Sequence, residues 1–393
     1  MSGVLYLAWR YLSYHRAKTA ILVVSIALIV FLPAGLESVV DQGSRELTAR
    51  AEGTPLIVGE KGSQLELVLA SLYFESRTPQ ATRYEQVSRI EATGLAEAIP
   101  LHVRFQTRQH PIVGTSLEYF RFRGLGVERG RPMATLGECV VGAGAARRLG
   151  VGPGDHLISS PESVFDLAGA YPLKMRVVGV LAPSHGPDDG AVFVDLKTTW
   201  VIEGFGHGHR DLAAPEADAL ILAREGAEIT ANASVTEFNE ITESNAASFH
   251  FHGDLGSYPV TAVIAVPPDA KSLALLMGRY ESPDETAQAV LPAQVMDDLL
   301  ETVFTIQSYV VAAIGGVAIA TLATAALVFW LSIRLRQREI ETLVKIGAAR
   351  GSLAALLVSE VVAVLLFGCM LAAGLTLVAS RFASVAVRSL LLL

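Results

Sequence analysis

The sequence contains only two cysteines in 393 residues, Cys139 and Cys369, and the second lies inside an apolar run. Two cysteines placed in this way indicate no disulfide framework, and they identify neither a redox compartment nor a zinc–thiolate site. An excess of positive charge is also missing, since the formal net charge is −8. This balance argues against nucleic acid as a partner. No Ser/His/Asp or Cys/His arrangement suggests a catalytic site, and no internal repeat of fixed period is visible.

What the sequence does have is apolar residues. The mean hydropathy is +0.42, 51% of the residues are hydrophobic and only 18% are charged. This composition is too apolar for an ordinary soluble protein and too charged for a bundle that lies wholly in the membrane. We therefore expect a few membrane spans together with a sizeable soluble part.

Three apolar runs meet the length of roughly 20 residues that a helix needs to cross the hydrocarbon core of a bilayer. They predict membrane spans at residues 19–36, 308–333 and 352–380. Residues 1–18 mix aromatic and basic side chains, which is typical of a helix lying at the membrane interface on the cytoplasmic side. The alternative is the charged start of a cleaved signal peptide, although no clear small-residue cleavage pattern follows the first run.

Charges beside the spans predict the orientation. Arg10, Arg16 and Lys18 precede the first span, and three arginines follow the second span at Arg334, Arg336 and Arg338. Because basic flanks stay in the cytoplasm, both spans place residues 37–307 outside and residues 334–351 inside. Residues 381–393 form a C-terminal tail that is too short to cross the membrane again.

The external region reads as mixed α/β. The predicted fold class is therefore a membrane α-helical protein with three spans and a large α+β extracytoplasmic domain inserted between spans 1 and 2. We expect residues 54–109 and 217–280 to form one lobe and residues 112–215 to form an inserted lobe. Strands are predicted at 56–58, 103–106, 111–113, 138–141, 175–180, 191–194, 219–222 and 260–266. Helices are predicted at 64–72, 84–92, 144–149, 227–239, 270–277 and 292–308, the last running without a break into the second span.

Residues 334–351, which join the last two spans, are charged but patterned. Ile340, Leu343, Val344 and Ile346 can share one side of a helix. An amphipathic helix at the membrane surface is suited to docking a soluble partner.

This connector resembles that of the FtsX/MacB-type ABC transporter permeases, the family of the lipoprotein-releasing and macrolide-exporting permeases. The resemblance is clearest in two short stretches, Arg338-Glu339-Ile340-Glu341 and Lys345-Ile346-Gly347-Ala348. Residues 111–120, 138–155 and 176–183 resemble the external domain of the same family. The order of spans agrees, except that the family normally has a fourth span. We expect either a three-span variant or a truncated sequence.

The resemblance implies a permease subunit of a bacterial ABC transporter in the inner membrane, not itself an enzyme. By the resemblance, its connector would be a coupling helix that binds a cytoplasmic ATPase. The chain has no Walker A sequence, so ATP chemistry would come from that other chain. ATP and magnesium would be held by that partner, and this chain would carry no cofactor. We expect a mechanotransmission role in export or extraction, a homodimer, and a possible periplasmic binding or adaptor protein. The alternative is an FtsX-like signalling module that activates a periplasmic partner without transport. The expected coupling residues are Arg336, Arg338, Glu339, Ile340, Leu343, Lys345 and Gly347.

Histidines stand out in the external region. His207 and His209 lie near Asp211, His250 and His252 lie near Asp254, and His185 shares a turn with Asp188 and Asp189. Imidazole and carboxylate groups ligate zinc and copper. The two His-x-His pairs, together with Asp211 and Asp254, are therefore candidate metal ligands, and zinc is the metal that we expect them to bind. The alternative is a set of solvated loop histidines that binds no metal.

Two further features have competing interpretations. Glu360 is a carboxylate inside an apolar run, which indicates either a helix contact or coupling role or a position near the cytoplasmic interface. Residues 142–147 resemble half of a dinucleotide-binding loop, but Arg147 replaces the third glycine. A helix beginning after a strand explains them better.

Overall fold

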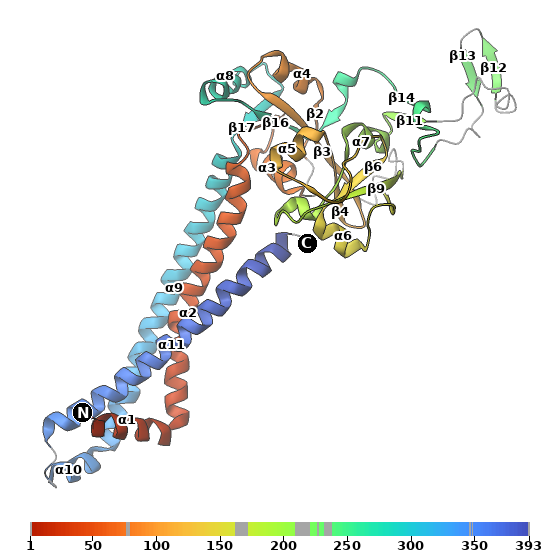
Figure 1. Ribbon diagram of the computed structural model, residues 1–393. Helices are drawn as coiled ribbons and strands as arrows, with labels where there is room; N and C mark the ends of the chain where they lie inside the picture. The colour runs from red at the N-terminus through yellow and green to blue at the C-terminus, as the bar shows by residue number, and fades with distance from the viewer. Residues whose placement is uncertain are drawn as a thin grey trace. The chain divides into compact units, whose positions relative to one another are not determined.

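A computed structural model describes residues 2–75, 79–161, 172–208, 221–225, 228–231, 238–345, 347 and 349–391 (Figure 1). The chain divides into two compact units. A helical unit is formed by residues 1–47 and 298–390, and an α/β unit is built on residues 48–297.

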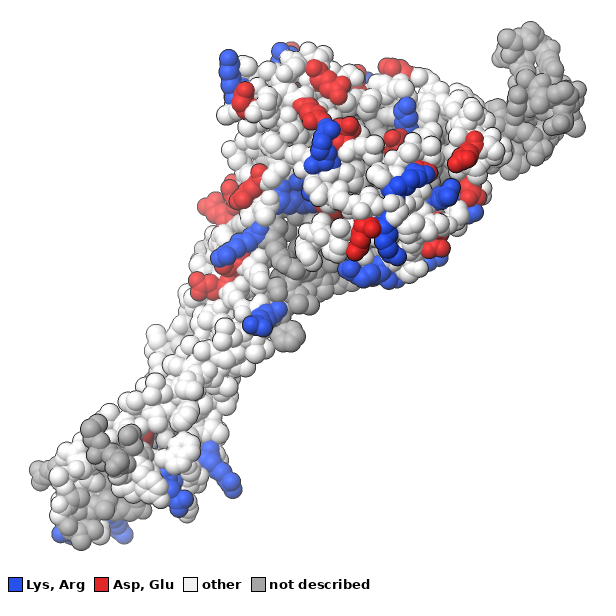
Figure 2. Space-filling view, viewed as in Figure 1, with Lys and Arg blue, Asp and Glu red and all other residues white. Residues whose placement is uncertain are grey.

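The helical unit contains α1 (Ser2–Tyr14), α2 (Arg16–Glu52), α9 (Pro292–Leu335), α10 (Gln337–Lys345) and α11 (Arg350–Leu391). Within the described residues, three helices are long and apolar enough to cross a membrane: Arg16–Glu52, Pro292–Leu335 and Gly351–Arg381. Figure 2 shows a long stretch of this unit without charged side chains. The expectation of three apolar spanning helices is therefore supported by length and composition.

Two of these helices are longer than the predicted spans. α2 passes through Pro33 and continues to Glu52, because a helix can absorb one proline when neighbouring groups satisfy the freed carbonyl. α9 confirms the expected continuous helix, since it starts at Pro292 and runs unbroken to Leu335. Each helix begins or ends inside the α/β unit, so both units share unbroken helical backbone.

A small apolar core holds the helical unit together. Leu12 of α1, Ile26 of α2 and Val364 of α11 are buried, with Phe329 of α9 packed against them. α2 and α11 approach closely at Gly368, where an added Cβ would lie 2.6 Å from Ile26 Cγ2. Small residues permit this kind of close helix packing in membranes.

The α/β unit is organised around one sheet of eleven strands, whose main path runs β17-β1-β16-β3-β4-β10-β6-β9-β5. β7 adds to β9, and β8 adds to β3. The strands of the sheet are β1 (Leu56–Glu60), β3 (Glu97–Thr107), β4 (His110–Thr115), β5 (Val127–Gly130), β6 (Glu138–Val141), β7 (His156–Ile158), β8 (Ser160–Pro161), β9 (Lys174–Leu181), β10 (Val192–Asp195), β16 (Ala262–Val266) and β17 (Ala287–Val290). Three small pairs join β2 (Thr82–Arg83) to β15 (Pro259–Val260), β11 (Gly206–Gly208) to β14 (Phe249–Phe251), and β12 (Ile221–Glu225) to β13 (Glu228–Ala231).

Short helices accompany this sheet. They are α3 (Gln64–Tyr73), α4 (Glu85–Ala92), α5 (Leu117–Arg123), α6 (Ala143–Leu149), α7 (Leu196–Ile202) and α8 (Ala270–Tyr280), with 3₁₀ turns η1 (Pro187–Gly190), η3 (Ala246–Ser248) and η4 (Leu255–Ser257). Side-chain caps determine several starts, since Ser63, Asp195 and Asp269 each accept a bond from a backbone N–H of the first turn.

The flanking and middle segments contribute strands to this one sheet. Strands β1, β16 and β3 lie within the flanking segments, β17 lies beyond residue 280, and β4, β10, β6, β9 and β5 come from the middle segment. Two apolar clusters do not follow this division, because each takes residues from both parts of the chain. One joins Phe105 to Val192 and Val194, and the other joins Trp200 to Tyr258. The flanking and middle segments are joined by backbone hydrogen bonds between β3 and β4.

One predicted helix was wrong. Residues 227–239 were expected to be helical, but Glu228–Ala231 form β13 and pair with β12. Ile229 and Thr230 are β-branched and suit a strand, and here the strand pairing prevails over a weak helical pattern. Residues 227 and 232–237 of the predicted helix lie outside the described part of the chain.

Candidate functional site

The connector forms α10, a helix of nine residues flanked by Arg336 and by Gly347. Gly347 has a φ of +96°, a backbone conformation that favours glycine. Arg338 and Lys345 are exposed on this segment, and Ile340 is half-buried. α10 includes the backbone of Glu339 and Leu343, but the side chains of these two lie outside the described part of the structure. The side-chain charges and apolar residues of α10 suit a surface that docks against protein.

Arg336, just before α10, connects three helices of the helical unit. Its guanidinium donates to both carboxylate oxygens of Glu360 on α11, at 3.1 and 3.4 Å, and lies 3.8 Å from the centre of the Tyr11 ring on α1. Tyr11 in turn shares a hydrogen bond with Ser332 of α9. Glu360 is 4% exposed, and a buried carboxylate in an apolar helix needs such a partner. The structure thus places Glu360 in a helix contact beside the connector.

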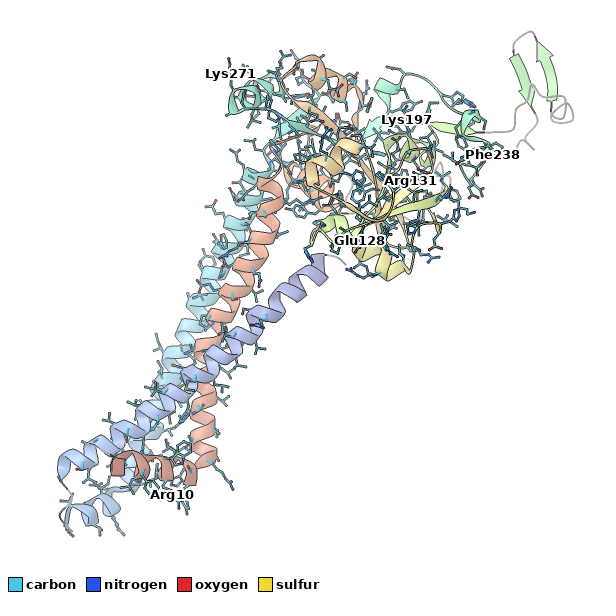
Figure 3. All side chains as sticks on the ribbon, viewed as in Figure 1. Arg10, Glu128, Arg131, Lys197, Phe238 and Lys271 are labelled. Carbon is cyan, nitrogen blue, oxygen red and sulfur yellow. The ribbon has the colours of Figure 1, made fainter. Side chains whose placement is uncertain are left out.

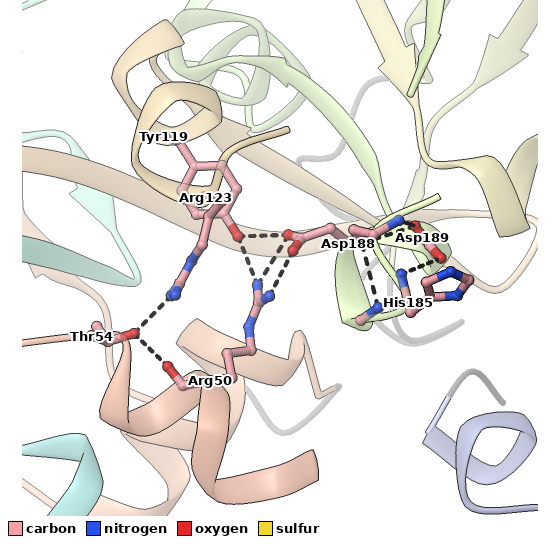
Figure 4. Close-up of polar contacts among 9 residues, drawn as sticks. Arg50, Thr54, Tyr119, Arg123, His185, Asp188 and Asp189 are labelled. Atoms are coloured by element: carbon pink, nitrogen blue, oxygen red, sulfur yellow. Dashed lines mark hydrogen bonds and ion pairs between the residues drawn. The ribbon is translucent and has the colours of Figure 1, made fainter. Parts of the chain in front are cut away.

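A second polar cluster lies at the end of α2, within the α/β unit (Figure 4). Arg50 donates to Asp188 Oδ2 at 2.6 Å and to Oδ1 at 3.0 Å, and Tyr119 donates to the same Oδ1 at 2.7 Å. Arg123 donates to Thr54 Oγ1, which donates to the carbonyl of Arg50. These bonds tie the last turn of α2 to α5 and η1.

Burial and charge oppose each other in this cluster. Burial disfavours the charged form of Asp188, but the Arg50 charge and the bonds from Arg50 and Tyr119 outweigh it, so the pKa of Asp188 lies below its ordinary value. Burial raises the pKa of the Tyr119 hydroxyl. Asp188 is therefore ionised and Tyr119 is neutral at physiological pH, and the cluster is an ion pair with an added donor.

The sequence reasoning missed this cluster. Asp188 was considered only as a neighbour of His185, and Arg50, Tyr119 and Arg123 were not singled out. Arg50 is 69 positions from Tyr119 and 138 positions from Asp188, so no spacing pattern could have connected them. His185 instead donates its backbone N–H to Asp189, and among the described residues it is in no group of potential metal ligands.

The glycines after β6 have a packing role. A Cβ at Gly142 would lie 2.2 Å from the carbonyl oxygen of Asp188, and one at Gly144 would lie 2.8 Å from that of Asp189. These glycines admit the backbone of η1 beside α6. They fit the interpretation of a helix that begins after a strand.

Three of the six predicted metal ligands come together. His207, His250 and His252 place their potential ligand atoms within 4.8 Å of one another. Asp254 is not in this group, and its side chain caps η4 by accepting from the Gly256 N–H. His209 and Asp211 lie outside the described residues.

Comparison with known proteins gives one family and a set of solved structures. The family model described as MacB-like periplasmic core domain matches residues 19–237. The extracellular domain of a noncanonical ABC-type transporter, YknZ, from Gram-positive bacteria is 12% identical, with a TM-score of 0.32, and covers 60% of this chain and 98% of its own. The periplasmic region of MacB from Actinobacillus actinomycetemcomitans is 11% identical, with a TM-score of 0.33, and covers 63% of this chain and 94% of its own. No curated protein sequence matches the chain.

Proposed function

The chain belongs to the FtsX/MacB-type family of ABC transporter permeases, and on that premise we propose that it couples ATP hydrolysis on a separate subunit to movement of its own α/β unit. The observation that carries this proposal is the length of α9. This helix of 44 residues starts next to β17, crosses the whole apolar stretch and ends just before α10. An unbroken helix transmits displacement along its axis because its hydrogen-bond ladder resists compression.

α10 is the proposed docking element for the ATPase. It is short, strongly amphipathic and carries basic and apolar side chains on a connector between two apolar helices. Arg336 links the start of this connector to Glu360 and Tyr11. A push on α10 would therefore reach α1 and α11 together with α9.

The polar cluster of Arg50, Tyr119, Arg123 and Asp188 is the proposed point at which movement of α2 is passed to the rest of the α/β unit. Arg50 belongs to the last turn of α2, and its partner Asp188 belongs to η1. Because the ion pair is buried, it holds a fixed geometry under load better than a solvated pair would. Movement of α2 would then displace α5 and η1 rather than slide past them.

Charge supports the proposed orientation. Arg16, Lys18, Arg334 and Arg338 flank the apolar stretches at one end of the helical unit, and Figure 2 shows blue side chains at that end and none along the stretch itself. By the positive-inside rule this end faces the cytoplasm, with the α/β unit in the periplasm of a bacterial inner membrane.

A second copy of the chain is the proposed partner within the membrane. Gly315 and Gly316 of α9 have no described atom near the position of an added Cβ. Small residues on an open part of a helix surface allow close approach of another helix. A periplasmic adaptor or binding protein, and a role in handling a transition metal, extend the same proposal.

The experiment is purification of the chain from its native membranes, followed by an assay for bound ATPase. Ile340→Asp should lower the amount of bound ATPase about thirtyfold, because a charge replaces an apolar contact worth about 2 kcal/mol. Gln337→Asp, an exposed position on the same helix, is the matched control and should leave binding unchanged.

Two results would contradict the proposal: no ATPase with the wild-type chain, or full binding by Ile340→Asp. An ATPase that binds the chain but drives no release of substrate would favour the signalling alternative over transport.

A further inference from the structure

A short two-stranded ribbon projects three imidazoles from one of its faces. β11 and β14 are antiparallel, and His207 lies directly opposite His250. His252 follows His250 by two positions, so both point to the same side of an extended chain. Cross-strand neighbours on one face lie about 5 Å apart, which brings His207 into the same group.

Aromatic packing on the opposite face fixes the register of this ribbon. An added Cβ at Gly206 would lie 2.6 Å from the Phe251 ring, and one at Gly208 would lie 2.5 Å from the Phe249 ring. Both rings pack against the apolar core of the α/β unit. A shift of one residue would move the phenylalanines to the solvent side and the histidines to the core. The phenylalanines therefore hold the histidines on the exposed face.

Further contacts hold the ribbon in place. Phe238, labelled in Figure 3, donates its backbone N–H to the Gly208 carbonyl at 2.8 Å, and its ring lies 6.5 Å from that of Phe249. The buried Tyr258 hydroxyl donates to the carbonyl of His252 at 2.6 Å. The backbone that carries the imidazoles is thus bonded on both sides.

The three rings form a compact group. Each pair of ring centroids among His207, His250 and His252 is 4.8 Å apart. His250 Nδ1 lies 3.0 Å from the Ser248 carbonyl. A carbonyl only accepts, so Nδ1 donates this bond, and in the neutral form of the ring Nε2 is the nitrogen that can ligate a metal. A carbonyl on one ring nitrogen is the usual way in which proteins orient a metal-binding imidazole.

We propose that His207, His250 and His252 form a binding site for a divalent transition metal of the zinc and copper class. Zinc bonds to imidazole nitrogen at about 2.0–2.1 Å in a tetrahedral site, which places ligand nitrogens about 3.4 Å apart. The ligand atoms are already within 4.8 Å, and small side-chain rotations close the difference. Three neutral nitrogens select zinc or copper over magnesium and calcium, which prefer oxygen.

Three protein ligands leave a fourth position of the tetrahedron for water or for a group on another molecule. The site is half-exposed, since His252 is solvent-accessible, so the fourth position can be reached from outside. This suits a site that exchanges its metal more than one that closes around it. The inference goes beyond coupling to an ATPase and stands without it.

Titration of the purified full-length chain with zinc, against a chromophoric chelator and without a polyhistidine tag, tests the site. The wild type should bind about one zinc per chain. His252→Gln should weaken zinc binding by about 100-fold, because loss of a direct ligand costs at least as much as loss of an orienting partner. His252→Cys, which restores a ligand atom, should recover most of the affinity.

His156→Gln is the matched control. His156 is a partly exposed histidine of the same α/β unit, paired with Glu240 and outside the cluster, and its replacement should leave zinc binding unchanged. Excess magnesium should not displace the zinc. No saturable zinc binding by the wild type, or equal affinity in the wild type and His252→Gln, would overturn the proposal. Because His156 and His252 are both exposed, circular dichroism should show unchanged melting in all three variants.

Discussion

Arg50 and Asp188, 138 positions apart in the chain, form a two-bonded ion pair with side chains only 11% and 4% exposed. This pair fastens the last turn of α2 to η1 (Figure 4). The guanidinium also lies 5.4 Å from the centre of the Phe74 ring. Its position is thus defined by a carboxylate on one side and an aromatic face on another.

Asp188→Asn should destabilise the α/β unit by about 3–5 kcal/mol, because it leaves the buried Arg50 cation without a counter-charge. Urea unfolding followed by tryptophan fluorescence measures this change. In a Trp9→Phe, Trp330→Phe background the remaining Trp200, buried in the α/β unit, reports on that unit alone.

The control for this prediction is Glu97→Gln. Glu97 pairs with Arg121 at 2.5 Å, but the two side chains are 49% and 70% exposed. A solvated pair contributes about 0–1 kcal/mol, so the control should be nearly neutral. An equal loss of unfolding free energy in Asp188→Asn and Glu97→Gln would mean that the buried pair stabilises the unit no more than the exposed pair does.

Glu138 should make the stability of the α/β unit depend on acid. Burial opposes its ionisation, but bonds from Arg131 and from the Ala134 and Thr135 N–H groups lower its pKa to about 2 from 4.5. A depressed pKa adds stability that is complete above the unfolded value and is lost as the pH falls from about 4.5 toward 2. The urea midpoint of Glu138→Gln should therefore change less than that of the wild type over this range. Parallel curves for the two proteins would contradict the assignment.

Gly368→Ala should destabilise the helical unit by about 1–3 kcal/mol, because the new methyl group would overlap the buried Ile26. Gly374→Ala is the matched control on the same helix, since no described atom lies within 4 Å of its added Cβ. That change should be neutral or stabilising by up to about 1 kcal/mol, as alanine favours a helix over glycine. Thermal melting of the full chain in detergent distinguishes the two, and a larger loss in the control would refute the packing argument.

Glu360→Gln should reduce ATPase stimulation by the chain by about 2- to 30-fold, equivalent to 0.5–2 kcal/mol of coupling. The charge-neutral amide weakens the bond with Arg336 that links α11 to the start of the connector. Ser359→Ala, which removes only a hydroxyl bonded within its own helix, should leave stimulation unchanged. The rate of ATP hydrolysis in reconstituted vesicles is the measurement, and an unchanged rate in Glu360→Gln would remove the pair from the coupling route.

Much of the fold was predictable because the patterns are local. Strand β6 was predicted with its observed bounds, Glu138 to Val141, since a short β-branched run stands between turn residues. The start of α3 was predictable from Ser63, whose side chain caps it. The strand β13 was missed because its pairing with β12 is a tertiary effect that outweighs local preference.

The candidate sites were predictable only in part. The two histidine pairs were visible in the sequence, but their meeting depends on the pairing of β11 with β14, which are more than 40 positions apart. Asp254 was included for its proximity in sequence, and it serves as a helix cap instead. The sequence could not connect Arg50 with Asp188, because an ion pair between residues far apart in the chain produces no pattern in the sequence.

The junction between β3 and β4 decides how the α/β unit can respond. The predicted boundary between lobes falls between residues 109 and 112. Just before it, Arg108 and Gln109, with φ of +46° and +70°, form a two-residue hairpin turn that keeps the strands paired from Leu101 to Thr115. Six paired positions cannot come apart without losing several backbone hydrogen bonds, each worth about 1 kcal/mol. A clamshell opening between the two parts of the sheet would therefore have to break this ladder, whereas a motion that keeps the sheet intact would not.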